Sequence, residues 1–176
     1  KVLQAFERFR LLCAVREGDW GVTGLNTAIE RELIARKRLV KDGPWYAGRP
    51  VMVTRNDSAL GVFNGDIGIT LPSPDGLLRV YFLDGDQLRS VGVARLAHIE
   101  TAFAMTVHKS QGSEFTHAAL VLPAYGGSVL GRELVYTGIT RAKAQCTVFT
   151  QHPKVLAQAL AQPTQRHSGL LEFFDS

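Results

Sequence analysis

The sequence predicts an α/β fold in which a small antiparallel β barrel or sandwich interrupts a mostly parallel sheet. Three short, continuous apolar runs have the composition of strands buried on both faces. The first of these runs is followed by a loop and a helix, which is the order of an α/β unit. Between residues 48 and 98, short strands alternate with turns rich in Gly, Asp and Pro, which is typical of a small antiparallel barrel.

The first part of the chain contains the predicted α/β unit. Residues 1–10 place apolar side chains at helical spacing, so we expect an amphipathic helix there. Residues 11–15 form the first buried strand, and residues 16–21 form a polar loop. Residues 23–41 have an apolar face and a basic last turn, which predicts a second helix.

The segment 48–98 is expected to be an inserted domain made of strands and tight turns. Asn64-Gly65-Asp66 is the clearest turn, because Asn and Gly favour the backbone angles that hairpins need. The predicted strands are residues 51–54, 67–71, 78–82 and 88–93.

The α/β pattern returns from about residue 99, so residues 1–47 and 99–176 are predicted to form one domain around the insert. We expect strands at 101–107, 118–122 and 146–150 and helices at 132–142 and 153–161, with Pro153 in the first turn of the last helix. The runs 11–15, 118–122 and 146–149 would be the central strands of the parallel sheet. The tail 163–176 ends in apolar residues that we expect to dock on another surface.

Composition restricts the possible classes of protein. The 176 residues are 45% hydrophobic and 20% charged, which excludes a wholly disordered chain. No apolar run approaches the roughly 20 residues of a membrane helix, so no membrane partner is expected. The chain opens at Lys1 with neither a signal peptide nor an initiator Met, and we therefore expect a fragment or a processed chain.

The net charge of +4 is unevenly distributed. Residues 1–50 hold ten basic and six acidic side chains, residues 51–100 four and six, and residues 101–176 six and four. This pattern favours a phosphate-bearing partner at the two ends, although a solvated surface would have the same charge. Cys13 and Cys146 lie in apolar runs without metal-ligand spacing, so we expect buried free thiols in a reducing compartment and no metal site.

Two polar segments border the predicted buried strands, at the edge of the sheet where open α/β sheets bind ligands. The first, residues 106–115, combines hydroxyls, an imidazole, a lysine, an amide and a Gly-permitted turn. Backbone phosphates are bound by several hydrogen-bond donors that do not read the bases, so this set of side chains suits a phosphate partner. A short helix that starts near His108 would also point free N–H groups at an anion. A plain polar loop with a Gly cap explains the same spacing equally well.

The second segment, residues 135–143, ends a predicted helix with Thr140 and Arg141 beside a strand. An arginine there can complement the helix C-terminus, which is the simpler interpretation of the residue alone. It can also reach a phosphoryl group during transfer, because its planar guanidinium makes bidentate contacts with developing charge.

Together the two segments resemble motifs V and VI of superfamily 1 helicases, and the match is closer to the RecD family, the α subunit of bacterial exodeoxyribonuclease V. The sequence TVHKSQGSEF at 106–115 is followed by VYTGITRAK at 135–143, which is a highly specific combination. Two further blocks resemble the same family in order and spacing, so that the resemblance covers nearly the whole chain: LCAVREG at 12–18 with GLN at 24–26, and VMVTRND at 51–57 with FNGDIG at 63–68.

The resemblance implies a RecA-like second helicase domain with an SH3-like barrel inserted at about 48–98. Such enzymes bind ATP between two RecA-like domains and carry single-stranded DNA across them. By this resemblance Arg141 is the catalytic arginine that stabilises the γ-phosphate in the transition state. Residues on the nucleotide side would be Gln111, Gly112, Glu114 and Arg141, and residues facing DNA would be Thr106, His108, Lys109 and Ser110.

The resemblance also implies partners and a setting. We expect single-stranded DNA, an N-terminal RecA-like domain of the same protein and other exodeoxyribonuclease V subunits, acting 5′→3′ in double-strand-break repair and recombination in the bacterial cytoplasm. Arg16, at the end of the first strand, is placed for a phosphate contact or for a surface salt bridge.

The sequence departs from a complete motor. It contains no G-x-x-x-x-G-K-[ST] loop and no acidic Mg²⁺-binding pair after an apolar strand. ATP and Mg²⁺ would therefore be bound mainly by an N-terminal half, and this chain alone is predicted to lack ATPase activity. The alternative is a non-catalytic module that binds protein or nucleic acid through the barrel. Nuclease activity is not supported, because the sequence contains no visible cluster of Asp, Glu and Lys residues for two-metal cleavage.

Overall fold

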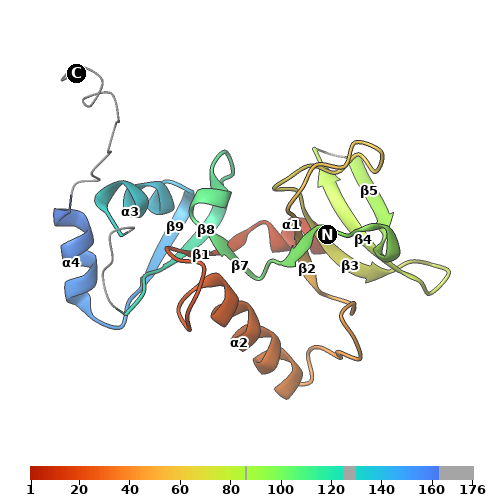
Figure 1. The fold of residues 1–176 in the computed structure, drawn as a ribbon, viewed down its shortest axis with the longest axis horizontal. Coiled ribbons are helices and arrows are strands. Elements are labelled where there is room, and N and C mark those ends of the chain that lie inside the picture. The colour runs from red at the N-terminus through yellow and green to blue at the C-terminus, as the bar shows by residue number, and fades with distance from the viewer. Residues whose placement is uncertain (86, 125–129, 163–176) are drawn as a thin grey trace, which may run out of the picture.

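The computed structural model describes residues 1–85, 87–124 and 130–162, whose strands form two sheets that lie side by side along the long axis of the molecule (Figure 1). The predicted docking of the tail 163–176 lies outside these residues. Within the described residues, no helix has the length and apolar character needed to cross a membrane.

The first sheet is four-stranded and parallel. Its strands are, in spatial order, β7 (Ala104–Thr106), β1 (Phe9–Cys13), β8 (Phe115–Val121) and β9 (Ala142–Phe149). Leu12 in β1 aligns with Met105 in β7 and Leu120 in β8, and all three side chains are buried. The prediction that the three apolar runs form strands of one parallel sheet is therefore confirmed, but β9 lies at an end of the described sheet rather than at its centre.

Helices cover both faces of the parallel sheet (Figure 1). Helix α2 (Val22–Ala35) lies on one face, where Val22 packs with Cys13 and Ala104. Helix α3 (Arg132–Ile139) lies on the other, where Leu134 and Val135 share a core with Leu12 and Leu120. Helix α4 (Pro153–Ala161) packs against α3 and has the predicted bounds. Successive strand residues point to opposite faces, so β1 contributes to both cores.

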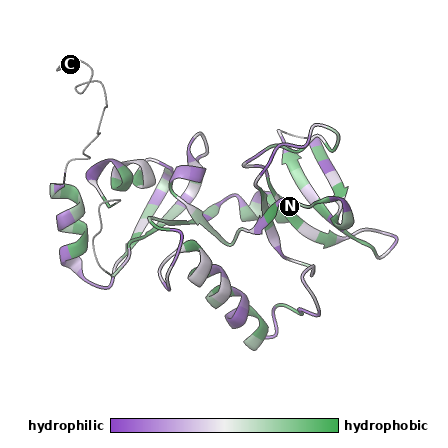
Figure 2. Cartoon of the chain, viewed as in Figure 1, coloured by the Kyte–Doolittle hydropathy of each residue, from purple (hydrophilic) through white to green (hydrophobic). Residues whose placement is uncertain are grey.

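The second sheet is antiparallel and five-stranded. Its strands run in the spatial order β5 (Gln87–Gly92), β4 (Leu78–Asp84), β3 (Ile67–Pro72), β2 (Pro50–Val53) and β6 (Ile99–Thr101). A short 3₁₀ helix, η1 (Val93–Arg95), joins β5 to β6. The strands of this sheet carry hydrophobic residues, drawn in green in Figure 2, beside hydrophilic ones. A core separate from that of the parallel sheet contains the strand residues Val51, Val53, Val80, Phe82 and Val91 together with Val62 and Leu96 from the segments between strands.

The four strands expected in the insert are present, and the predicted turn at 64–66 has Gly65 at φ 97°, in the left-handed region. The sheet continues to Thr101, beyond the expected boundary at residue 98, because Val51 pairs with Thr101 and Met52 with Glu100. The SH3-like barrel form and the division into two domains remain predictions.

Several element boundaries differ from the sequence-based expectation because pairing between strands overrides local pattern. The first helix, α1, covers only Val2–Phe6, and β1 already begins at Phe9, which pairs with His117. Residues 101–107, expected as one strand, divide between β6 and β7 in different sheets. Strand β9 begins at Ala142, since this residue pairs with Phe115, and the helix before it therefore ends at Ile139.

Helix α2 ends at Ala35 rather than near residue 41. The amide of Lys37 donates to the carbonyl of Ile34, and the amide of Arg38 donates to that of Leu33. Lys37 adopts φ 54°, so these bonds form the left-handed closure that usually has glycine at this position. The basic residues after Ala35 thus lie beyond the helix instead of in its last turn.

The cysteines differ in environment. Cys13 is fully buried in β1, as expected. Cys146 is exposed because its strand lies at the end of the sheet, so the prediction of a buried thiol is wrong for this residue.

Candidate functional site

The segment 106–115 connects two neighbours of the central strand β1. Strand β7 ends at Thr106, a single 3₁₀ turn, η2 (His108–Ser110), follows, and β8 begins at Phe115. The Val107 amide donates to the Cys13 carbonyl (3.0 Å), and the Ser110 hydroxyl donates to the Val107 carbonyl (2.6 Å). Gly112, at φ 84°, turns the chain back toward β8. The segment is therefore fixed on the sheet by its own backbone.

Its side chains point in different directions. His108 and Gln111 are exposed, and neither side chain has a hydrogen bond or ion pair with any other described residue. Thr106 is half-buried, and its hydroxyl accepts from the Lys109 amide (3.3 Å). Ser110 is fully buried, so its hydroxyl stabilises the turn and does not face solvent.

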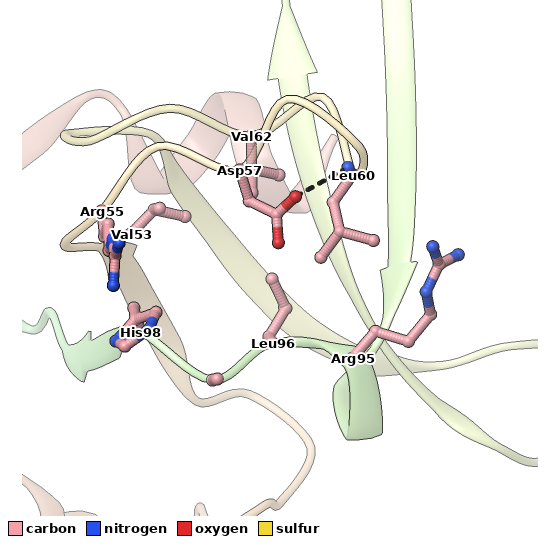
Figure 3. A pocket seen from close by; sticks show the side chains of 9 residues that line it. Val53, Arg55, Asp57, Leu60, Val62, Arg95, Leu96 and His98 are labelled. Carbon is pink, nitrogen blue, oxygen red and sulfur yellow. Dashed lines mark hydrogen bonds between the residues drawn. The ribbon is translucent and has the colours of Figure 1, made fainter.

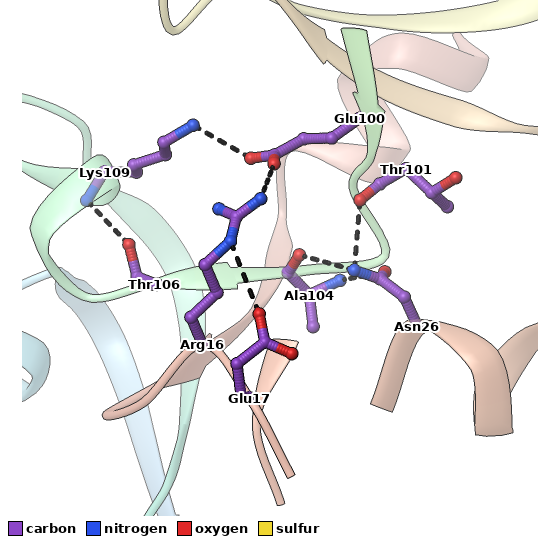
Figure 4. A network of polar contacts seen from close by, with 8 residues as sticks. All are labelled: Arg16, Glu17, Asn26, Glu100, Thr101, Ala104, Thr106 and Lys109. Atoms are coloured by element: carbon purple, nitrogen blue, oxygen red, sulfur yellow. Dashed lines mark hydrogen bonds and ion pairs between the residues drawn. The ribbon is translucent and has the colours of Figure 1, made fainter. Parts of the chain in front are cut away.

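The carboxylate of Glu100 bonds to two basic side chains near this turn (Figure 4). Glu100, in β6, accepts from Arg16 Nη2 through Oε2 (2.7 Å) and from Lys109 Nζ through Oε1 (2.9 Å). Arg16 follows β1, and its Nε lies 3.7 Å from Glu17. Burial opposes ionisation of Glu100, but the hydrogen bonds from Lys109 and Arg16 outweigh it and lower the pKa of the carboxyl. The hydrogen bond with Glu100 and the negative charge of that carboxylate raise the pKa of Arg16.

The backbone that carries Glu100 is held by Asn26 of α2. Its Nδ2 donates to the carbonyls of Thr101 (3.0 Å) and Ala104 (3.2 Å), and its Oδ1 accepts from the Ala104 amide (2.9 Å). Asn26 thus fixes the link at which the chain passes from the antiparallel to the parallel sheet (Figure 4). Its three good hydrogen bonds explain how a polar side chain is buried in a helix face.

Arg141 lies between α3 and β9 and reaches back to the end of segment 106–115. Its Nη1 donates to the Ser113 carbonyl (3.2 Å), its Nε to the Thr137 carbonyl (3.2 Å), and its Nη2 to the Thr140 hydroxyl (3.4 Å). Each acceptor is a neutral oxygen, and Arg141 has no ion pair within the described residues. The guanidinium is thus oriented by neutral oxygens and has no carboxylate partner among the described residues.

The two motif segments meet at the amino end of the parallel sheet. The Phe115 amide donates to the Arg141 carbonyl (2.8 Å), and Lys143 Nζ lies 3.4 Å from the Glu114 carboxylate. Lys109, Thr106 and Arg16 lie instead toward the carboxyl ends of β7 and β1, where ligands were expected for both segments. The predicted site residues therefore form two groups, one at each end of the strands.

A pocket of about 330 Å³ borders the group that contains Glu114. Its walls come from both sheets, and they carry three carboxylates and one guanidinium: Glu7, Arg10, Gly65, Asp66, Ile67, Leu83, Ser113, Glu114 and Phe115. Arg10 is 1% exposed and lies against the rings of Phe6 (4.2 Å) and Phe115 (5.0 Å). The acidic lining favours a ligand with hydroxyl donors over one with phosphates.

The Arg10 guanidinium is only partly satisfied. Its Nε and Nη1 have no hydrogen-bond partner among the described residues. Burial lowers the pKa of Arg10 to about 10, against a smaller opposing effect of Glu7, and this value still leaves the side chain charged near neutral pH. The two ring faces supply part of the stabilisation that hydrogen bonds would give.

A second pocket lies within the antiparallel part, between β2 and the segment that leads to β6 (Figure 3). Asp57 points into it and accepts from the Leu60 amide (3.1 Å), with Arg55, Arg95 and His98 at its margin. Its volume of about 30 Å³ is that of a water molecule, so it is too small for a nucleotide. Within the described ranges, no group of three or more His, Cys, Asp or Glu could hold a metal ion.

Sequence reasoning assigned no site role to Glu100, Asn26 or Arg10, although Asn26 lies in the GLN block at 24–26 that resembles the RecD family. Glu100 is 84 residues from Arg16, and Asn26 is 78 from Ala104, so local pattern contains no signal for either contact. Arg10 interrupts an otherwise apolar stretch from Phe9 to Val15, and this charge in a buried strand was the available signal.

The fold and the two motif segments correspond to the C-terminal domain of a superfamily 1 helicase. Residues 101–149 match the UvrD-like helicase C-terminal domain family. A solved structure of Bacteroides Pif1 helicase, in complex with ADP-AlF3 and ssDNA, superposes with a TM-score of 0.56 at 16% identity, covering 96% of this chain and 45% of that one. This likeness shows that the α/β fold with its parallel sheet is that of a helicase domain.

More specifically, the chain corresponds to the C-terminal region of RecD-family helicases. It is 42% identical to the RecBCD enzyme subunit RecD of Haemophilus influenzae over 94% of its length, and 41% identical to that of Mycobacterium tuberculosis over 96%. It is 31% identical to the ATP-dependent RecD2 DNA helicase of Deinococcus radiodurans over 93%. The chain spans 25%, 29% and 23%, respectively, of these relatives.

Proposed function

We propose that this chain is the C-terminal motor half of an ATP-dependent DNA helicase of the RecD type, and that the remainder of the protein supplies the phosphate-binding loop and the Mg²⁺ ligands. The observation that carries the proposal is the arrangement of Arg141. Its guanidinium is held by three neutral oxygens from two motif segments and has no described counter-ion. Arg141 also lies in the VYTGITRAK segment at 135–143, which resembles motif VI of superfamily 1 helicases.

The proposed role of Arg141 depends on the stage of the reaction at which negative charge develops on the γ-phosphoryl group. Bound ATP supplies a γ-phosphoryl group whose negative charge is redistributed during transfer. An arginine oriented before the reaction stabilises this charge without reorganising, so it lowers the barrier more than it strengthens ground-state binding. Gln111, Gly112 and Glu114 would line the same side, and Glu114 on the pocket wall could accept from a sugar hydroxyl.

The proposed contacts with DNA come from the site residues that lie toward the carboxyl ends of β7 and β1. Lys109 and His108 are accessible donors at the carboxyl end of the sheet, and the Thr106 hydroxyl anchors the turn that presents them. Ser110 would contribute through the turn, since its hydroxyl is already bonded. Contacts of this kind bind phosphates without reading bases, which suits movement along a strand.

The relatives suggest the setting. The Haemophilus influenzae and Mycobacterium tuberculosis relatives are RecD subunits of the RecBCD enzyme, and we propose the same assembly for the protein that contains this chain. It would act as the exodeoxyribonuclease V α subunit, with 5′→3′ polarity, in end processing for recombinational repair. A role on chromosomal DNA would place it in the bacterial cytoplasm.

The test is Arg141→Ala in the full-length protein. ATP turnover stimulated by single-stranded DNA should fall by about 10³–10⁵-fold, the range for arginines that complete phosphoryl-transfer sites, while nucleotide affinity changes little. Arg141→Lys should not restore turnover, because a point charge lacks the planar fork. Steady-state kinetics and fluorescent nucleotide binding separate the two effects. Unchanged kcat in the alanine variant would show that Arg141 is a helix-end charge only.

A further inference from the structure

We infer that Glu100 is a positioning residue: it holds Lys109 in the orientation in which that lysine contacts a DNA phosphate, while Arg16 fixes its second oxygen. The inference rests on the proposed function, because it assumes that Lys109 faces DNA. It assigns a role to an acidic residue of the antiparallel sheet, outside both motif segments.

The exposed fractions of the three side chains indicate that Glu100 positions Lys109 and does not compete with DNA for it. The Glu100 side chain is 18% exposed, Lys109 is 31% exposed and Arg16 is 56% exposed. The carboxylate therefore lies beneath the two cations, and their outer surfaces remain open to solvent. A phosphate can approach Lys109 from outside without displacing Glu100, since an ammonium group has three donors and only one is used here.

The carboxylate is itself held in place. Glu100 lies in β6, where it pairs with Met52 of β2. Asn26 bonds to the residue that follows it, Thr101, and to Ala104 beyond. Each carboxylate oxygen has a different cationic partner, so rotation of the carboxylate would break two charge-assisted hydrogen bonds (Figure 4).

Removing the carboxylate should release Lys109. A free lysine side chain samples many rotamers, so its contact with a phosphate also costs the conformational entropy of ordering that side chain. Loss of one ordered phosphate contact lowers the slope of log Kobs against log salt by about 0.7 for a single strand. The salt slope therefore reports the position of Lys109, whereas a residue that only stabilises the fold would not change it.

The experiment measures binding of a fluorescein-labelled oligothymidylate to the full-length protein by anisotropy over a range of NaCl concentrations. The variants are Glu100→Gln, Lys109→Ala and the double variant. Glu17→Gln is the matched control, because it removes the same charge from an exposed neighbour of Arg16. Thermal melting by circular dichroism confirms folding, and Glu100→Asp replaces Glu100→Gln if the latter unfolds.

We expect Glu100→Gln to lower the slope by about as much as Lys109→Ala, the double variant to lower it no further, and Glu17→Gln to leave it unchanged. A lower slope for Lys109→Ala alone, with wild-type behaviour in the Glu100 variant, would overturn the inference and leave the proposed function intact. A steeper slope for the Glu100 variant would overturn it too, showing that the carboxylate competes with DNA. An unchanged slope for Lys109→Ala would overturn the DNA contact of the proposed function itself, and the inference with it.

Discussion

Arg141 illustrates what residue type and position can and cannot establish. The sequence places an arginine at the end of a helix beside a strand, and that position alone favours a helix-end charge. The structure adds that its guanidinium spans to the Ser113 carbonyl, 28 residues away, and to the Thr137 carbonyl in the preceding helix α3. The resulting orientation depends on a contact between two segments, and no local pattern contains it.

The two cysteines give a prediction at the same scale. Cys13 is fully buried, and burial raises the pKa of its thiol to about 12, so it stays protonated at pH 8. Cys146 is exposed on β9. Partial burial raises the pKa of the Cys146 thiol too, but this side chain is accessible, so a disulfide reagent such as DTNB should modify Cys146 in the native chain and Cys13 only after unfolding. Equal rates for both thiols, followed by absorbance, would contradict the assigned position of β1 in the core.

At the scale of elements, the apolar runs were predictable because burial on both faces leaves a simple signature in composition. Residues 11–13 and 118–121 lie in strands as expected, and the last helix has its predicted bounds since Pro153 marks its start. The start of β9 was missed because Ala142 is placed by its pairing with Phe115. Likewise, nothing local divides residues 101–107 between two sheets; the bonds from Asn26 do so.

The relation between the two sheets also gives a prediction. The Ala102 amide donates to the Pro50 carbonyl (2.9 Å), so the chain enters and leaves the antiparallel sheet at neighbouring points. Deleting residues 51–101 and joining the ends with a short Gly/Ser linker should therefore leave the parallel sheet folded. Some stability should be lost, roughly 2–5 kcal/mol for the missing Met52 side chain, which packs into the parallel-sheet core. A circular dichroism spectrum without helix signal would show that the sheets fold only together.

At the scale of the whole molecule, the proposed function makes this chain half of an active site. The oriented but unpaired Arg141 lies at one end of the parallel strands, and the Glu100, Lys109 and Arg16 network lies toward the other. Because the sequence contains no phosphate-binding loop, the proposed function requires a second RecA-like domain that supplies one. The chain spans between 23% and 30% of the length of its RecD relatives, so most of the polypeptide of those relatives has no counterpart in it.

The most direct measurement compares ATP hydrolysis, stimulated by single-stranded DNA, by the full-length protein, by its Arg141→Ala variant and by this chain alone. We predict rapid turnover by the full-length protein and turnover lower by about 10³-fold or more in the variant. This chain alone should show no turnover above the uncatalysed rate. Hydrolysis by this chain alone, or a full-length protein that binds DNA but does not hydrolyse ATP, would contradict the assignment of a helicase motor half and favour a non-catalytic binding module.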